Sequence, residues 1–157
     1  MAHGLKLLDC EHEFTPLAAA TKINLSATVF EVGGSTPTNI IHTDQDWYVD
    51  VEWSISGNLV RHFCGNWRVA VQLESIGPGK EYHFPDPSAA VKMDPCGDGK
   101  YKYRIEVKAG EVAARDPDGT LYIVSVTLGS TDPCDRPGHI YAYCTGEELH
   151  FVPGPSH

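Results

Sequence analysis

Long apolar runs are missing from this 157-residue sequence. No window approaches the roughly 18 consecutive apolar residues that a membrane-spanning helix requires, which argues against a membrane span. Basic residues are also scarce, because 12 Lys and Arg stand against 21 Asp and Glu for a formal net charge of −9. Binding to nucleic acid depends on clustered positive charge, so this balance argues against nucleic acid as a partner and favours a soluble, acidic protein.

Known catalytic fingerprints are missing as well. The sequence has no Gly-x-Ser-x-Gly elbow, no P-loop and no dinucleotide-binding glycine pattern. A secretory leader is not evident either, since Asp9, Glu11 and Glu13 stand where its apolar centre would lie. We therefore expect a cytoplasmic protein, or a secreted one if a leader has been removed.

The five cysteines cannot all pair within one chain. In a cytoplasmic protein the default expectation is that they remain free, reduced thiols. The alternative is a disulfide between Cys134 and Cys144, which would close a Pro- and Gly-rich loop.

Period-two alternation of apolar and polar residues is abundant, and it predicts β-strands. It is clearest at residues 23–29, 47–55, 67–73 and 101–107. Turn signals separate these from further expected strands at 59–64, 82–84, 90–93, 121–128, 140–144 and 148–152. Near Phe30 and Val32 the apolar set changes parity, which predicts a β-bulge or a strand that passes between sheets.

Short strands with turn signals every ten or so residues predict an all-β fold. The leading architecture is an antiparallel β-sandwich of immunoglobulin or fibronectin type, and the alternative is a small β-barrel. We expect an N-terminal arm or edge strand at 1–20, one sandwich domain at 21–152 and a frayed tail at 153–157.

Charged residues segregate onto the outward faces of two expected strands. An acidic row contains Asp46, Asp50 and Glu52, and a basic row contains Lys100, Lys102, Arg104 and Lys108. If the strands are neighbours, the two rows form cross-strand ion pairs. If the strands are apart, the basic row is a surface for an acidic partner.

Residues 121–128 are apolar on both faces, because Leu121 and Ile123 stand opposite the inward row. Either the N-terminal leucines at 5, 7 and 8 cover these two side chains, or the side chains form a protein contact. They are our candidate partner-binding residues, together with the basic row.

Two Cys/His pairs at i, i+2 spacing suggest a zinc site, because residues two apart on a strand share a face. Its ligands would be Cys10, His12, His62 and Cys64. The same chemistry could serve a thiol enzyme, with Cys64 as nucleophile and His62 or His139 as base.

Aspartates cluster in loops and suggest calcium ligands, although turn-forming aspartates explain them with fewer assumptions. The positions are Asp44, Asp46, Asp94, Asp98, Asp116, Asp118, Asp132 and Asp135. A carbohydrate platform would use the remaining candidate rings, namely Tyr48, Tyr82, Tyr141 and Tyr143.

The sequence therefore predicts a non-enzymatic interaction or assembly module that binds another protein or itself, with no cofactor. A metal-dependent or thiol enzyme and a small-ligand or carbohydrate-binding domain remain the alternatives.

Overall fold

The structure is a computed structural model, and it describes residues 9–13, 21–33, 36–58 and 60–154. The residues at 9–13, 139 and 147 are described by their backbone alone. The described chain is all-β, with one short 3-10 turn, η2. Its elements in order are β1 (Asp9–Glu13), β2 (Thr21–Glu31), β3 (Ile40–His42), β4 (Trp47–Gly57), η2 (Val60–His62), β5 (Asn66–Ser75), β6 (Tyr82–Lys92), β7 (Lys100–Val107), β8 (Thr120–Thr131) and β9 (Pro137–Val152).

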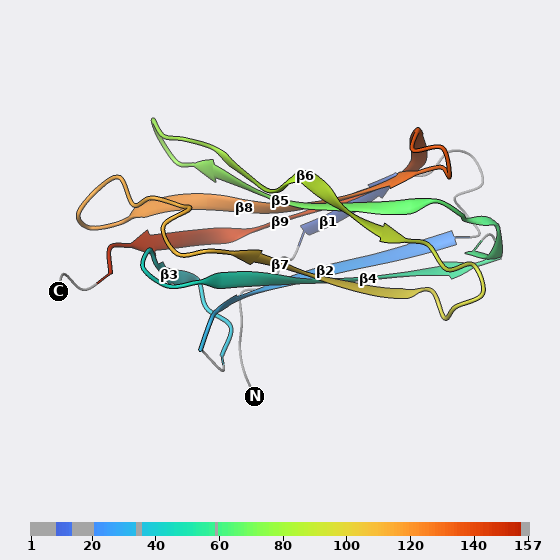
Figure 1. Ribbon diagram of the computed structural model, residues 1–157, viewed down its shortest axis with the longest axis horizontal. Helices are drawn as coiled ribbons and strands as arrows, with labels where there is room; N and C mark the ends of the chain where they lie inside the picture. The colour runs from blue at the N-terminus through green and yellow to red at the C-terminus, as the bar shows by residue number, and fades with distance from the viewer. Residues whose placement is uncertain (1–8, 14–20, 34–35, 59, 155–157) are drawn as a thin grey trace.

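The strands form two sheets that face each other as layers (Figure 1). The smaller sheet has the order β2-β4-β7, and both of its pairings are antiparallel. The larger sheet has the order β1-β9-β8-β5-β6, and β3 pairs with β9 in parallel. The sheets do not close into a ring of strands, so the barrel alternative is wrong.

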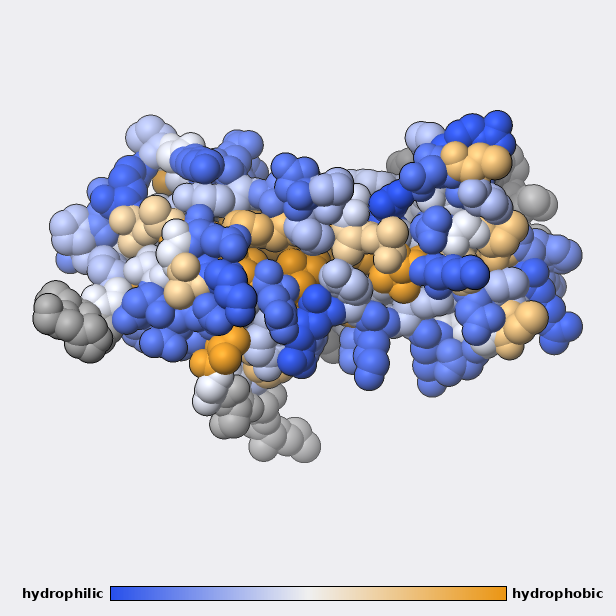
Figure 2. All heavy atoms as spheres, in the orientation of Figure 1, coloured by the Kyte–Doolittle hydropathy of each residue, from blue (hydrophilic) through white to orange (hydrophobic). Residues whose placement is uncertain are grey.

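A single hydrophobic core lies between the two layers. The inward row of β4 supplies Trp47, Val49, Val51, Trp53 and Ile55, all buried, as the alternating sequence predicts. Trp67 of β5 packs against Trp53 at 6.1 Å between ring centroids. In Figure 2 the apolar residues appear as a band between two mostly hydrophilic layers.

The expected irregularity at Phe30 is absent. Strand β2 pairs with β4 in an unbroken register from Thr21 to Glu31. Phe30 points outward because it stacks on its cross-strand partner Tyr48, with 5.1 Å between ring centroids. The parity change therefore marks an aromatic pair on the outer face, and the prediction of a bulge is wrong.

Three expected strand boundaries are also wrong. Residues 59–64 do not form a strand within the described chain, because η2 and a loop lead into β5. The expected strand at 82–84 and the expected strand at 90–93, except for its last residue, are parts of β6, whose register against β5 shifts between them. The strands expected at 140–144 and 148–152 are parts of the single strand β9.

Candidate functional site

Strands β4 and β7 are neighbours, so the acidic and basic rows lie side by side on the outer face of the smaller sheet. In the register Asp50 is opposite Arg104 and Glu52 is opposite Lys102. The Arg104 guanidinium donates to both carboxylate oxygens of Asp50, at 2.7 and 3.1 Å. The structure thus confirms the cross-strand interpretation for this pair.

Arg104 is also held by an aromatic ring. Its Cζ atom lies 4.0 Å from the centroid of the Tyr48 ring, a cation–π contact. The hydrogen bond to Asp50 raises the pKa of Arg104. The Arg104 guanidinium therefore makes both of these contacts, with Asp50 and with Tyr48, within the chain.

Lys108, directly after β7, and Asp46, directly before β4, form a second ion pair at 3.1 Å. The backbone N–H of Ala109 donates to the same carboxylate at 2.8 Å, and this donor, followed by Lys108, lowers the pKa of Asp46. Among the residues that the structure describes, Lys100 and Lys102 form no ion pair. A role for the basic row in binding a partner stays a prediction.

Leu121 and Ile123 lie on the outer face of the larger sheet, in its central strand β8. They are 39% and 38% exposed. The backbone N–H of Ile76 donates to the Leu121 carbonyl at 3.1 Å, which places this exposed isoleucine beside Leu121. On the other side His150 lies between Leu121 and the exposed Ile40 of β3. We call Ile40, Ile76, Leu121 and Ile123 the aliphatic patch.

Charged side chains border the aliphatic patch. Ile123 lies in register between Glu74 of β5 and Glu148 of β9. Arg115 lies over the loop that follows β5, where a Cβ added to Gly77 would be 4.0 Å from its guanidinium nitrogen. An apolar centre with a polar rim is the usual make-up of a protein contact surface.

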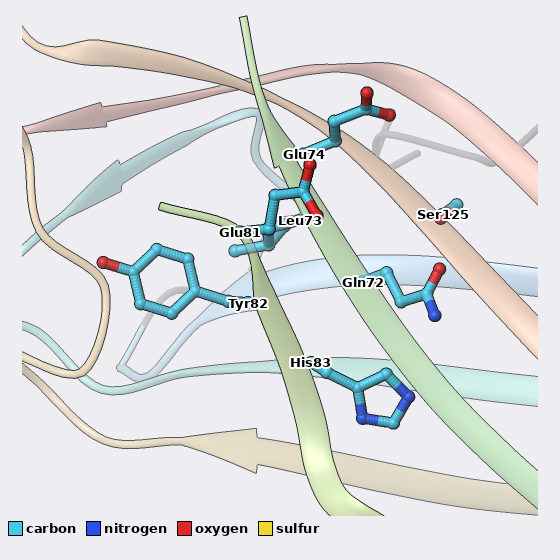
Figure 3. A pocket seen from close by; sticks show the side chains of 7 residues that line it. All are labelled: Gln72, Leu73, Glu74, Glu81, Tyr82, His83 and Ser125. Carbon is cyan, nitrogen blue, oxygen red and sulfur yellow. The ribbon is translucent and has the colours of Figure 1, made fainter. Parts of the chain in front are cut away.

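A shallow hollow adjoins this rim between β5 and β6 (Figure 3). Gln72 and His83, which are register partners, line one part of it. The carboxylates of Glu74 and Glu81 line another part, and Ser125 of β8 lies across from them. The hollow is open and polar, and we interpret it as the acidic margin of the aliphatic patch.

The N-terminal leucines that could cover Leu121 and Ile123 lie outside the described residues. The choice between coverage and a protein contact therefore stays a prediction. Ile40 and Ile76 are additions to the sequence-based candidates. Neither residue belongs to an alternating run, and their position depends on pairings made far along the chain.

The expected zinc and thiol residues do not have the geometry that suggested them. His62 ends η2 and Cys64 follows in a loop, so they do not share a strand face. The side chains of Cys10, His12 and His139 lie outside the described residues. Within the described part of the chain, no three His, Cys, Asp or Glu side chains gather so that they could hold a metal ion.

Carboxylates of the loop aspartates accept backbone hydrogen bonds within their own turns. The Asp94 carboxylate accepts the Cys96 N–H at 3.0 Å, and the Asp132 carboxylate accepts the Cys134 N–H at 2.8 Å. The turn interpretation is confirmed at these two positions. The backbone N–H of Arg136, followed by its guanidinium, lowers the pKa of Asp132.

The four candidate tyrosines do not form one platform. Tyr48 is on the outer face of the smaller sheet, whereas Tyr141 and Tyr143 lie on β9 of the larger one. Tyr82 packs inward, with its ring 5.9 Å from that of Tyr122. The expectation of a shared carbohydrate surface is therefore wrong for this set.

Cys144 is fully buried and disulfide-bonded, whereas Cys134 is exposed and free. Both the pairing of these two cysteines and the expectation of five reduced thiols are wrong. The physical reason is that Cys144 points into the core from β9, while Cys134 lies at the tip of the β8–β9 hairpin. The residue opposite Cys144 in the register of β1 with β9 is Cys10.

No protein-family model matches this chain, and no curated protein is similar enough to match it. Within the described residues, no helix is long and apolar enough to cross a membrane.

Proposed function

We propose that this protein is an interaction module, built on a β-sandwich of immunoglobulin type, that associates with a second copy of itself through the aliphatic patch. The observation that carries the proposal is the exposure of Leu121 and Ile123 on β8, which lies between β5 and β9. Outward positions of such a sheet are normally polar, as Ser125 and Thr127 are farther along the same strand. Large aliphatic side chains grouped on an outer face indicate a contact surface.

Strand order supports the immunoglobulin type. If β2 is strand A, the smaller sheet has the order A-B-E, and the larger sheet contains C′-C-F-G as β6-β5-β8-β9. These are the sheet partners found in immunoglobulin-like sandwiches, apart from the added strand β1.

Two side chains also support it. Trp67 on β5 is fully buried, at the place of the core tryptophan of strand C. Tyr122, near the start of β8, donates its hydroxyl to the Ala113 carbonyl at 2.9 Å, which matches the tyrosine corner of strand F. Val124 stands two residues later, where antibody domains carry a cysteine, so the inter-sheet disulfide of those domains has no counterpart at this position.

The size of the aliphatic patch suggests a reversible contact. Its side chains expose on the order of 300 Å² of apolar surface. A stable interface buries about 800 Å² on each partner, so the surrounding rim and shallow hollows must contribute the rest. We expect a dissociation constant on the order of 100 μM.

A two-fold contact sets the same surface of both copies against each other. Glu74 and Glu148 flank Ile123, and Arg115, whose guanidinium is paired with Asp116 at 3.0 Å, lies over the loop after β5. Because an axis through Ile123 would bring these acidic side chains of the two copies together, we expect the axis to pass nearer Leu121.

Static light scattering over a concentration series tests the proposal, on protein whose exposed thiols have been alkylated. We expect the wild-type mass to rise from 17.2 kDa towards twice that value, and the Leu121→Asp/Ile123→Asp double variant to stay monomeric. Val32→Asp is the control, because Val32 is an exposed aliphatic residue in the turn directly after β2 of the other sheet. A wild-type protein that stays monomeric, or a double variant that associates like the wild type, would contradict the proposal.

A further inference from the structure

Three cysteines are free and exposed, and all three lie at one end of the molecule. Cys64 is in the loop before β5, Cys96 is between β6 and β7, and Cys134 is between β8 and β9. These loops gather at the right-hand end of Figure 1. We call this region the three-thiol end.

Gly65 joins the three loops. Its carbonyl accepts the Met93 N–H at 3.0 Å, which ties the loop before β5 to the loop after β6. A Cβ added to Gly65 would lie 2.0 Å from the Thr131 carbonyl oxygen and 2.9 Å from the Asp132 carbonyl carbon. The hairpin that carries Cys134 is therefore in direct backbone contact with the loop that carries Cys64.

Two of the loops present their cysteine in the same way. Residues 94–96 and 132–134 both read Asp-Pro-Cys. In each, the aspartate carboxylate accepts the cysteine N–H, at 3.0 and 2.8 Å. In each, the aspartate carbonyl accepts the N–H of the residue after the cysteine, at 3.2 and 2.9 Å. Each thiol is thus carried into solvent on a turn whose backbone is fixed.

The disulfide elsewhere in the chain indicates the redox environment in which these three thiols are found. Cys144 is disulfide-bonded, and such bonds persist in oxidising compartments. An odd number of exposed cysteines cannot be consumed by pairing within one chain, which favours bonds between chains. We propose that the three-thiol end is a covalent attachment site, at which Cys96 and Cys134 form disulfides with a second copy of this chain.

Two thiol–disulfide exchanges form each bond, with a low-molecular-weight disulfide such as glutathione disulfide as the oxidant. In the first, the Cys134 thiolate attacks a sulfur of the oxidant, a protein–glutathione bond forms, and glutathione thiolate leaves and takes up a proton. In the second, a cysteine thiolate of the other copy attacks Cys134 Sγ and releases the second glutathione. Two protein thiols are oxidised and one glutathione disulfide is reduced to two glutathione molecules.

The attachment is reciprocal, because both copies carry both Asp-Pro-Cys turns and can be related by a two-fold axis. It lies at the end of the layers and does not involve the aliphatic patch. The covalent contact and the reversible contact of the proposed function can therefore be tested separately.

The experiment incubates purified protein with a mixture of reduced and oxidised glutathione, followed by non-reducing electrophoresis and intact-mass measurement. We expect a dimer that dithiothreitol dissociates in the wild type, in Cys64→Ser and in Leu121→Asp/Ile123→Asp. The dimer should be lost in Cys96→Ser/Cys134→Ser, whose circular dichroism spectrum should match that of the wild type because both residues are exposed.

Three results would overturn the proposal. The first is a wild-type protein that stays monomeric, with its exposed thiols free or bound to glutathione. The second is a monomer with a disulfide between two of the exposed cysteines. The third is undiminished dimer formation by Cys96→Ser/Cys134→Ser. Loss of light-scattering association in Leu121→Asp/Ile123→Asp with the disulfide dimer intact would separate the two contacts.

Discussion

Gly65→Ala should lower the free energy of unfolding by about 4 kcal/mol, as the sum of two costs. The first is backbone strain, because Gly65 has φ of +121°, where an alanine costs on the order of 1–3 kcal/mol. The second is steric, because the new Cβ would lie 2.0 Å from the Thr131 carbonyl oxygen. That oxygen belongs to the backbone at the end of β8 and cannot rotate away, and overpacking of this kind costs about 1–3 kcal/mol.

Gly110→Ala is the matched control. Gly110 also has positive φ, +83°, but nothing lies within 4 Å of an added Cβ. The control therefore carries the backbone cost alone, about 1 kcal/mol. The difference between the two variants combines the close approach of the Cys64 loop to the β8–β9 hairpin with the larger backbone cost at the φ of Gly65.

Urea denaturation followed by tryptophan fluorescence measures both variants. With a slope of about 2 kcal/mol per molar urea, the midpoint should fall by about 2 M for Gly65→Ala and by about 0.5 M for Gly110→Ala. Equal shifts, with unchanged slopes, would refute the contact at Gly65 and with it the packing together of the loops at the three-thiol end.

Three further predictions concern other parts of the fold. Tyr122→Phe should cost about 1 kcal/mol in thermal unfolding, because the Ala113 carbonyl loses its donor; an unchanged melting temperature would contradict the tyrosine corner. The backbone N–H of Arg136 is the first cause of the lowered pKa of the Asp132 carboxyl. The ionised carboxylate therefore stabilises the fold above the unfolded pKa of about 3.9, and this contribution is lost as the pH falls through the lower folded value. Asp132→Asn should therefore flatten the loss of stability in acid, and an identical acid limb would contradict this assignment. Peptide mapping without reduction should recover Cys144 in a disulfide, and a free Cys144 thiol would contradict the buried bond.

The alternation of apolar and polar residues was sufficient to predict a strand where one face of that strand is buried in the core. The row from Trp47 to Ile55 alternates in the sequence and is buried throughout, because β4 is the central strand of the smaller sheet and one of its faces covers the core. Strand β3 could not be predicted in this way. Its three residues are too few to show a period, and they become a strand through pairing with the distant β9.

In the candidate sites, too, the sequence indicated the features that depend on neighbouring residues and did not indicate those that depend on distant pairings. The sequence indicated the exposed pair Leu121 and Ile123, because both break an alternation that can be counted locally. It did not indicate that Ile76 lies beside them, which requires the register of β5 with β8. Likewise, the repeated Asp-Pro-Cys turns are visible in the sequence, but their convergence at Gly65 depends on the fold.

Side-chain footprinting with hydroxyl radicals tests the central claim most directly. Labelling of Ile76, Leu121 and Ile123 is measured at concentrations below and above the expected dissociation constant, with Val32 as the internal reference. The proposed contact predicts that labelling of the three residues falls as the concentration rises, while labelling of Val32 stays constant. Association with undiminished labelling of Leu121 and Ile123 would show that the molecules meet through another surface.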